Sequence, residues 1–411
     1  MADALAAPAA AAPSWPDRLP GVLRRWWVQV LILFVASRIV STVMMLAQAS
    51  ILLPADAPHD LVSLSNLWDA EWYHIVAVYG YPAELPLDYR GYVQGNPWAF
   101  LPLYPYVVTA VSVVTWLPWE VGAIVVSVLA GAGTALLAYR LFATRFPAAG
   151  ALAATAILLV NPVSLVTQVA YAESLQLLLL TAALLLLVRR RYWLMLPFVV
   201  LVSFSHPTGL AIALAMAGHI AHRWWRHRRG LERFPVPEAV AALVVAAAGV
   251  LAGFAWSLIA WAATGVPGAY TETEFSWRAS YIGHVPFIPF APWIQGAIWW
   301  GEFVGLPRWA GPFVLLAILV AVAAILLSPW MRRIGPDLRI WVASWLVYLL
   351  AVFFPQSSTW RMLLPAYPAL GAFAAARSRW VVPVVLALCL VGQWLWIGAC
   401  WIRIDGDWTP P

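Results

Sequence analysis

Residues 26–47 read WWVQVLILFVASRIVSTVMMLA, an apolar run with one arginine, Arg38, inside it. About 20 apolar residues in a helix are enough to cross the hydrocarbon core of a membrane. The whole chain of 411 residues is 63% hydrophobic and 10% charged, whereas soluble domains carry about 25% charged residues. A water-facing surface cannot be built from this composition, so the sequence predicts an all-α polytopic membrane protein.

A cleaved signal peptide is the alternative interpretation of this run, because residues 47–49 (AQA) resemble a cleavage site. We favour an uncleaved helix, since the run has spanning length and contains Arg38. Residues 1–20 are rich in Ala and Pro and are expected to form a disordered cytoplasmic N-terminus. Residues 21–411 then form a single transmembrane domain.

Ten more apolar segments are candidate spans, which predicts a bundle of about eleven transmembrane helices. They are 119–142, 148–168, 171–188, 192–204, 208–222, 239–262, 310–328, 339–354, 362–376 and 381–402. Segment 100–117 is also apolar, but Pro102 and Pro105 interrupt it and tryptophans flank it.

The arginines decide where segment 100–117 lies. If it lies along the outer interface instead of crossing, 18 of the 24 arginines fall on one side of the membrane. This asymmetry follows the positive-inside rule, and a crossing segment would scramble it. The sequence therefore predicts a cytoplasmic N-terminus, interfacial helices, and two long outer loops, 48–118 and 265–309. We expect the plasma membrane as the location.

Several classes of function are disfavoured. The positive charges lie in short runs between apolar segments, so no soluble basic surface for nucleic acid is expected. There is no GxxxxGK[ST] phosphate loop, which argues against ATP-driven transport. His219, His222 and His227 lie beside arginines without an acid or Cys; we interpret them as membrane-surface charge and expect no metal site and no cofactor.

The first outer loop contains the stretch NLWDAEWYH, residues 66–74. Trp68, Trp72 and Ile75 share one helical face, which predicts a helix lying on the membrane surface. Asp69 would then sit at the depth of a lipid phosphate. The alternative is that tryptophan and aspartate only anchor and cap an interfacial helix.

A lipid-linked sugar donor, whose phosphate is fixed at the membrane surface, would explain an acid at this depth. Transfer of the sugar with inversion needs a carboxylate that accepts the proton of the acceptor hydroxyl. It also needs cations that stabilise the departing phosphate. Asp69 is the candidate base, and Arg361, at the end of the stretch SSTWR, is the candidate phosphate ligand. The alternative for Arg361 is a long side chain that snorkels to the interface.

Three further polar groups interrupt apolar surroundings on the predicted outer side. They are the stretch from Gln168 to Ser174, the turn HPTG that begins at His206, and Arg278 with Glu272 and Glu274. His206 is either a hydrogen-bonded turn residue or part of a site. For Arg278 and the two glutamates, the alternative is charge exposed on a solvated loop.

Seven motifs follow one another along the chain: WDAEWY (68–73), GY (80–81), FLPLYP (100–105), NP (161–162), YAES (171–174), PTG (207–209) and RMLLPAYP (361–368). In this order they resemble the PIG-V type mannosyltransferases, which belong to the GT-C class of membrane glycosyltransferases. The resemblance extends over residues 26–402.

The resemblance implies a polyprenyl-phosphate-mannose donor, inversion at the anomeric carbon, and a catalytic aspartate in the first outer loop. It assigns catalytic roles to Asp69 and Glu173. Substrate contacts are assigned to Trp68, Glu71, Tyr73, Tyr171, His206, Arg278 and Arg361. His206 stands where bacterial relatives often have arginine. The expected partners are the lipid-linked donor, membrane lipid, and a glycolipid, lipoglycan or protein acceptor.

Two other classes of function remain as alternatives. A transporter or lipid flippase would show internal repeats and polar sites at the membrane midplane, whereas here the ionisable residues apart from Arg38 are expected at the membrane faces and not at the midplane. A scaffolding subunit would not need acids and cations that converge on one face.

Overall fold

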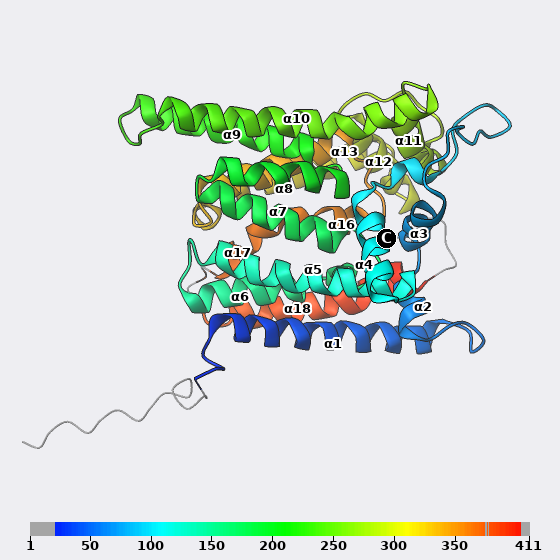
Figure 1. Ribbon diagram of the computed structural model, residues 1–411, viewed down its shortest axis with the longest axis horizontal. Helices are drawn as coiled ribbons and strands as arrows, with labels where there is room; N and C mark the ends of the chain where they lie inside the picture. The colour runs from blue at the N-terminus through cyan, green and yellow to red at the C-terminus, as the bar shows by residue number, and fades with distance from the viewer. Residues whose placement is uncertain (1–20, 375, 377, 404–411) are drawn as a thin grey trace, which may run out of the picture.

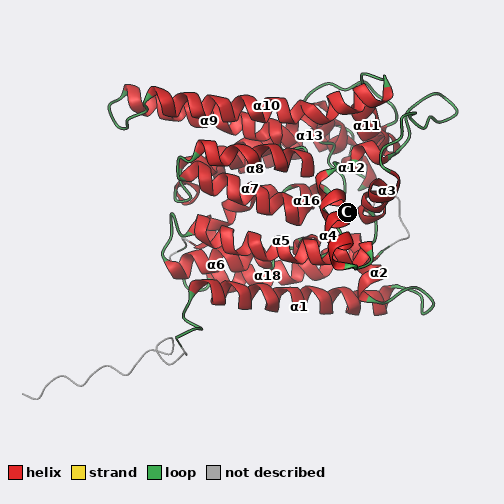
Figure 2. Ribbon diagram, in the orientation of Figure 1, coloured by secondary structure: helices red, strands yellow, loops and turns green. Residues whose placement is uncertain are grey.

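The computed structural model describes residues 21–374, 376 and 378–403. The N-terminal segment 1–20 lies outside the described residues, as does Arg377, which entered the count of arginines. Within the described residues every regular element is helical (Figure 2), apart from one isolated β-bridge between Leu87 and Val93. The expectation of an all-α protein is confirmed.

The helices follow one another along the whole chain (Figure 1). They are α1 (Trp26–Leu52), α2 (Leu61–Ser65), α3 (Asp69–Tyr79), η2 (Pro97–Ala99), α4 (Leu103–Thr115), α5 (Trp119–Phe142), α6 (Ala148–Leu159), η3 (Ser164–Thr167), α7 (Glu173–Val188), α8 (Tyr192–Ser205), α9 (Gly209–Arg228), α10 (Val236–Thr264), α11 (Ala269–Ile282), α12 (Ala291–Phe303), α13 (Ala310–Leu327), α14 (Pro329–Arg332), α15 (Pro336–Val352), α16 (Thr359–Met362), η4 (Leu364–Leu370), α17 (Gly371–Ala374), α18 (Val381–Trp396) and η5 (Ile397–Ile402).

Five described helical segments are long and apolar enough to cross a membrane: α1, α5, α10, α13 and the segment Val381–Ile402. Their outward faces remain apolar, because Phe313, Val320 and Leu327 on α13 are each more than 60% exposed. A large exposed apolar surface of this kind is costly in water and matches a lipid environment. The protein is therefore a membrane protein.

The two ends of the bundle differ in what they carry. The short turns between α5 and α6, α7 and α8, and α9 and α10 lie at the left end of the bundle in Figure 1. α2, α3, α4 and α11 gather at the right end. The triple-arginine turn 189–191, between α7 and α8, thus lies at the opposite end of the bundle from α3, which begins at Asp69. α4 stays at its own end, so segment 100–117 does not cross the bundle.

Arg38 stabilises a break in one predicted span. Segment 148–168 is α-helical only over α6, which ends at Leu159, and the chain then forms the short 3₁₀ helix η3. The Arg38 guanidinium, buried inside the bundle, donates to the carbonyls of Leu159 (2.6 Å) and Ser164 (2.7 Å). Carbonyls at a helix end lack hydrogen-bond partners within the helix. Arg38 therefore has backbone carbonyls as its partners and does not need a carboxylate.

Segment 362–376 is not one continuous helix. It consists of the end of α16, then η4 and α17. Pro365 and Pro368 lie in η4, and each lacks the N–H that an α-helix interior needs. Each of the other predicted spans overlaps an α-helix. The short, bent connection after α15 leaves Arg361 at the end of the bundle instead of inside a span.

His219 is not a membrane-surface charge, contrary to the sequence interpretation. It is buried, its Nδ1 lies 2.7 Å from Oδ1 of Asp337, and the Tyr192 hydroxyl lies 2.8 Å from its Nε2. Arg190 pairs with the same carboxylate at 3.1 Å. The acid was missed because it lies on α15, more than a hundred residues along the chain from α9.

Candidate active site

The backbone around Asp69 is held in an unusual conformation. Trp68, the residue before α3, has a φ of 60°, a value that costs a side-chain-bearing residue about 1–3 kcal/mol. Two hydrogen bonds hold it: the Trp68 indole donates to the carbonyl of Trp401 (2.9 Å), and the Asp69 amide donates to the Tyr171 hydroxyl (3.1 Å). The start of α3 is therefore fixed against two distant segments.

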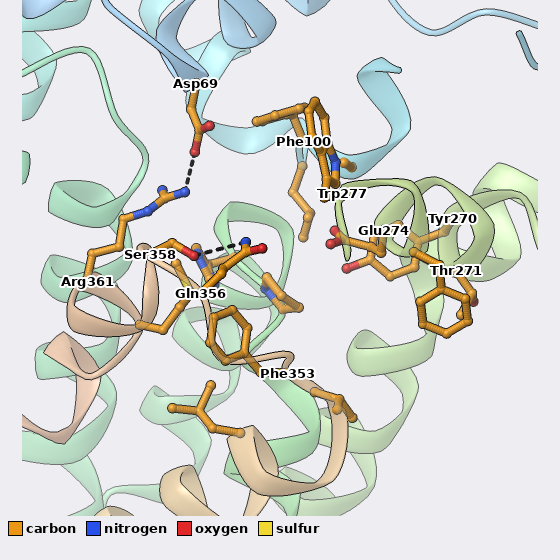
Figure 3. A pocket seen from close by; sticks show the side chains of 18 of the residues that line it. Asp69, Phe100, Tyr270, Thr271, Glu274, Trp277, Phe353, Gln356, Ser358 and Arg361 are labelled. Atoms are coloured by element: carbon orange, nitrogen blue, oxygen red, sulfur yellow. Dashed lines mark hydrogen bonds and ion pairs between the residues drawn. The ribbon is translucent and has the colours of Figure 1, made fainter. Parts of the chain in front are cut away.

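Three of the predicted residues meet in one ion-pair network. Nη2 of Arg361 lies 2.6 Å from Oδ2 of Asp69 (Figure 3), and Nη1 of Arg361 lies 2.7 Å from Oε1 of Glu173. The Arg361 guanidinium also lies 5.2 Å from the centre of the Tyr171 ring. Side-chain exposure rises from 1% for Glu173 through 11% for Arg361 to 22% for Asp69. Asp69 is thus the accessible end of the network.

Burial and charge oppose each other in this network. Burial raises the pKa of Asp69, and the positive charge of Arg361 offsets part of that rise. Burial by itself lowers the pKa of Arg361, but the carboxylates of Asp69 and Glu173 more than compensate and raise it well above its usual value. Arg361 therefore stays charged, and Asp69 holds a proton more firmly than an exposed aspartate.

A cavity of about 660 Å³ opens in front of Asp69 and Arg361. Six of the residues predicted from the sequence line it: Trp68, Asp69, Glu71, Tyr73, His206 and Arg361. Glu173 and Tyr171 do not line it and contact the network from behind. This volume lies within the range of about 300–1,000 Å³ that is common for small-ligand pockets.

Trp68 and Trp72 pack against protein, whereas the sequence interpretation placed their shared helical face on the membrane surface. Trp72 stacks on Phe100 with ring centres 5.6 Å apart and meets the edge of Trp277 at 5.7 Å. Both tryptophans line the cavity. The spacing that predicts a surface helix is also the spacing of a helix whose aromatic face packs inward.

His206 lines the cavity as a neutral ring. Burial, together with the positive charge of nearby Arg361, lowers the pKa of His206 to about 3. Its Nδ1 is buried and has no hydrogen-bond partner among the described residues. The position thus presents a neutral imidazole to the cavity and adds no positive charge at neutral pH.

Arg278 is not brought into this cavity. It lines a separate space of about 230 Å³, where its Nη2 donates to the Val285 carbonyl at 2.6 Å. Its guanidinium lies 3.9 Å from the centre of the Phe275 ring. A neighbour on the same helix, Glu274, lines the main cavity instead.

The sequence interpretation named Glu274 among the polar groups of the second outer loop but did not assign it to the site. Figure 3 shows it across the cavity from Asp69 and Arg361. The signal was present in the spacing: Tyr270, Glu274 and Trp277 lie at i, i+4 and i+7 and so share one helical face. Other cavity residues left out by sequence reasoning are Trp72, Phe100, Gln356 and Ser358. Among the described residues, no group of three or more His, Cys, Asp or Glu side chains is arranged to hold a metal ion.

No family model and no curated protein sequence matches the chain. Its structure is similar to a crystal structure of the Archaeoglobus fulgidus oligosaccharyltransferase, tethered through a disulfide bond to an acceptor peptide that contains the NVT sequon. The TM-score is 0.48 and the sequence identity is 12%, over 92% of this chain and 55% of that chain. The protein thus spans about half the length of that structure.

Proposed function

We propose that the protein is a membrane glycosyltransferase of the GT-C class that transfers a sugar from a lipid-phosphate donor to an acceptor hydroxyl, with inversion. The observation that carries the proposal is the contact of Arg361 with Asp69 at the edge of the cavity. It places a carboxylate that can accept a proton beside a cation that can bind a phosphate.

Asp69 is the proposed general base. It is the more exposed carboxylate of the network, and burial raises its pKa above that of an ordinary aspartate. A stronger base removes a hydroxyl proton more effectively, provided that it is ionised at the working pH. Glu173 is almost fully buried, so we assign it the task of orienting Arg361 instead of a contact with substrate.

Arg361 is the proposed phosphate ligand. Its charge is already shared between two carboxylates, so a donor phosphate at Arg361 competes with Asp69 for the guanidinium. Binding of the donor then loosens the Asp69–Arg361 pair and frees the base for the acceptor. The neutral His206 ring, which lines the same cavity, can donate one further hydrogen bond to the phosphate.

In the proposed step, the acceptor oxygen forms a bond to the anomeric carbon while the bond from that carbon to the phosphate oxygen breaks. Asp69 takes the proton of the acceptor hydroxyl. The leaving polyprenyl phosphate keeps the electron pair of the broken bond, and the positive charge of Arg361 stabilises it.

A lipid-linked donor fits the apolar part of the cavity. Leu210, Phe254 and Val352 line it, and Phe254 is also 51% exposed on α10, one of the helices of spanning length. A prenyl chain could therefore reach the cavity from the side while its phosphate stays at the membrane surface. We propose polyprenyl-phosphate mannose as the donor, a glycolipid, lipoglycan or protein as the acceptor, and the extracytoplasmic face of the plasma membrane as the location.

The test is transfer of label from polyprenyl-phosphate mannose by the purified protein in lipid vesicles that contain a membrane extract as the source of acceptor. Asp69→Asn keeps the shape of the side chain and removes the base, so turnover should fall by about 10²–10⁴-fold. Asp60→Asn is the matched control. Asp60 caps α2 in the same loop by accepting from the Ser63 amide, and asparagine caps equally well.

Retained transfer by Asp69→Asn would exclude this mechanism. Solute or lipid flux through the vesicles without transfer of label would favour a transporter or flippase instead.

A further inference from the structure

α11 forms the wall of the cavity that faces the Asp69–Arg361 pair (Figure 3). Tyr270, Glu274 and Trp277 lie on one face of this helix and line the cavity. Neither the proposed base nor the proposed phosphate ligand comes from α11. The side chains of this wall are therefore available to bind another part of the substrate.

Glu274 is the polar centre of the wall. It forms no ion pair with any described residue, although the charges of Asp69 and Arg361 reach it. Tyr270 lies one helical turn away on the same face of α11. Burial raises the pKa of Glu274, neighbouring Tyr270 opposes part of the rise, and the resulting pKa is about 7. A carboxyl group in this position still has acceptor sites for the donors of a ligand.

Trp277 provides a fixed apolar surface beside Glu274. Its ring meets Trp72 edge-on, with ring centres 5.7 Å apart, and lies 6.3 Å from Phe100 in the same way. Gly95 allows the close approach of the loop, because a Cβ there would lie 3.0 Å from the indole ring. Trp277 remains 37% exposed, so part of its ring is available to a ligand.

A pyranose ring matches both features. It has apolar C–H faces that pack on aromatic rings, and hydroxyl groups on its rim that donate to a carboxylate. Nucleotides and inorganic phosphate match less well, since an acidic side chain opposes their negative charge.

We infer that Glu274 and Trp277 form a sugar-binding subsite, in which a pyranose packs against Trp277 and its hydroxyls donate to the Glu274 carboxyl. The inference rests on the proposed function in one respect: the sugar belongs to the donor or to the acceptor of that reaction. Glu274 is a binding residue here, and Asp69 remains the base.

The test measures binding at equilibrium, using the full-length protein in lipid nanodiscs. Three probes are used: polyprenyl-phosphate mannose, polyprenyl phosphate without sugar, and methyl α-mannoside added with polyprenyl phosphate. Loss of a hydrogen bond to a charged group costs about 1.5–3 kcal/mol, so Glu274→Ala should weaken binding of a sugar that contacts it by about 10- to 100-fold. Polyprenyl phosphate should bind as it does to the unmodified protein.

The two sources of the sugar give different results. Weaker binding of polyprenyl-phosphate mannose alone assigns the subsite to the donor sugar. Weaker binding of methyl α-mannoside alone assigns it to an acceptor sugar. If Glu274→Ala and Trp277→Leu both leave the two sugar probes unaffected, the inference is wrong.

Glu272→Gln is the matched control, because Glu272 lies on α11 but lines the separate cavity that contains Arg278. An unchanged thermal unfolding profile of each variant shows that α11 has kept its fold. The binding readout is independent of turnover. If the unmodified protein transfers sugar but Glu274→Ala and Trp277→Leu do not weaken sugar binding, only the subsite is wrong. If the subsite variants weaken sugar binding but the unmodified protein transfers no sugar, only the proposed function is wrong.

Discussion

Arg361 holds Asp69 at 2.6 Å with one guanidinium nitrogen while its other terminal nitrogen binds Glu173 at 2.7 Å. Two carboxylates therefore share one cation, and a phosphate at Arg361 must compete with both.

Removing the charge of Asp69 should separate binding from chemistry. In Asp69→Asn, Arg361 loses a competing anion, so polyprenyl phosphate should bind as tightly as to the unmodified protein or several-fold more tightly, although transfer is lost. Fluorescence or calorimetric titration in nanodiscs measures this dissociation constant. A dissociation constant more than tenfold higher would mean that Asp69 assists phosphate binding instead of competing with it.

Lysine should not replace Arg361. A lysine ammonium is a compact charge that cannot reproduce the planar fork with which arginine serves two carboxylates at once. We expect Arg361→Lys to lower turnover at least tenfold and to weaken binding of polyprenyl phosphate. Arg308→Lys, at an exposed position between α12 and α13, is the matched control and should behave as the unmodified protein does. Normal turnover in Arg361→Lys would contradict the bridging role.

The rate of transfer should fall as the pH falls. Asp69 acts as a base only when ionised, and burial raises its pKa, so the loss should begin at a higher pH than for an exposed aspartate. The pKa of Glu274 is raised to about 7, so protonation of Glu274 can cause a second decrease of the rate near neutral pH. His206 stays neutral down to about pH 3 and should not contribute.

A pH–rate profile of Glu274→Gln separates these two groups. The limb near pH 7 should disappear if it belongs to Glu274, and the limb at lower pH should remain because it belongs to Asp69. A profile that stays flat from pH 8 to pH 4 in the unmodified protein would argue against any carboxylate base.

Arg38 should matter for stability and not for binding. Arg38→Met leaves the Leu159 carbonyl without the Arg38 donor and the Ser164 carbonyl with the Thr167 hydroxyl alone, and an unsatisfied buried group costs about 1–3 kcal/mol. The unfolding temperature in detergent should fall, while polyprenyl phosphate should bind unchanged to the protein that remains folded. An unchanged unfolding temperature together with lost transfer would instead give Arg38 a part in the reaction.

The all-helical fold and the difference between the two ends of the bundle could be predicted because hydropathy and arginine placement are local properties of the sequence. Asp69 and Arg361 were predicted for one site on the basis of their chemistry and motif order. Their direct contact, and the second contact of Arg361 with Glu173, depend on how distant helices pack, which no local pattern contains.

The second outer loop was the hardest part of the sequence to interpret. Within 265–309 the charges of Glu274 and Arg278 stand four residues apart, yet one lines the main cavity and the other a separate one. Only the packing of α11 against its neighbours distinguishes them. Proline placement, by contrast, was available in the sequence and explains why 362–376 does not form one helix.

The network around Arg361 also has a consequence for biosynthesis. Glu173 and Asp69 come early in the chain and their shared cation comes only after α15. A nascent chain that has been synthesised only as far as α10 thus contains Glu173 but not Arg361, whose charge balances it in the folded protein. The ion-pair network is therefore complete only after α16 has been synthesised.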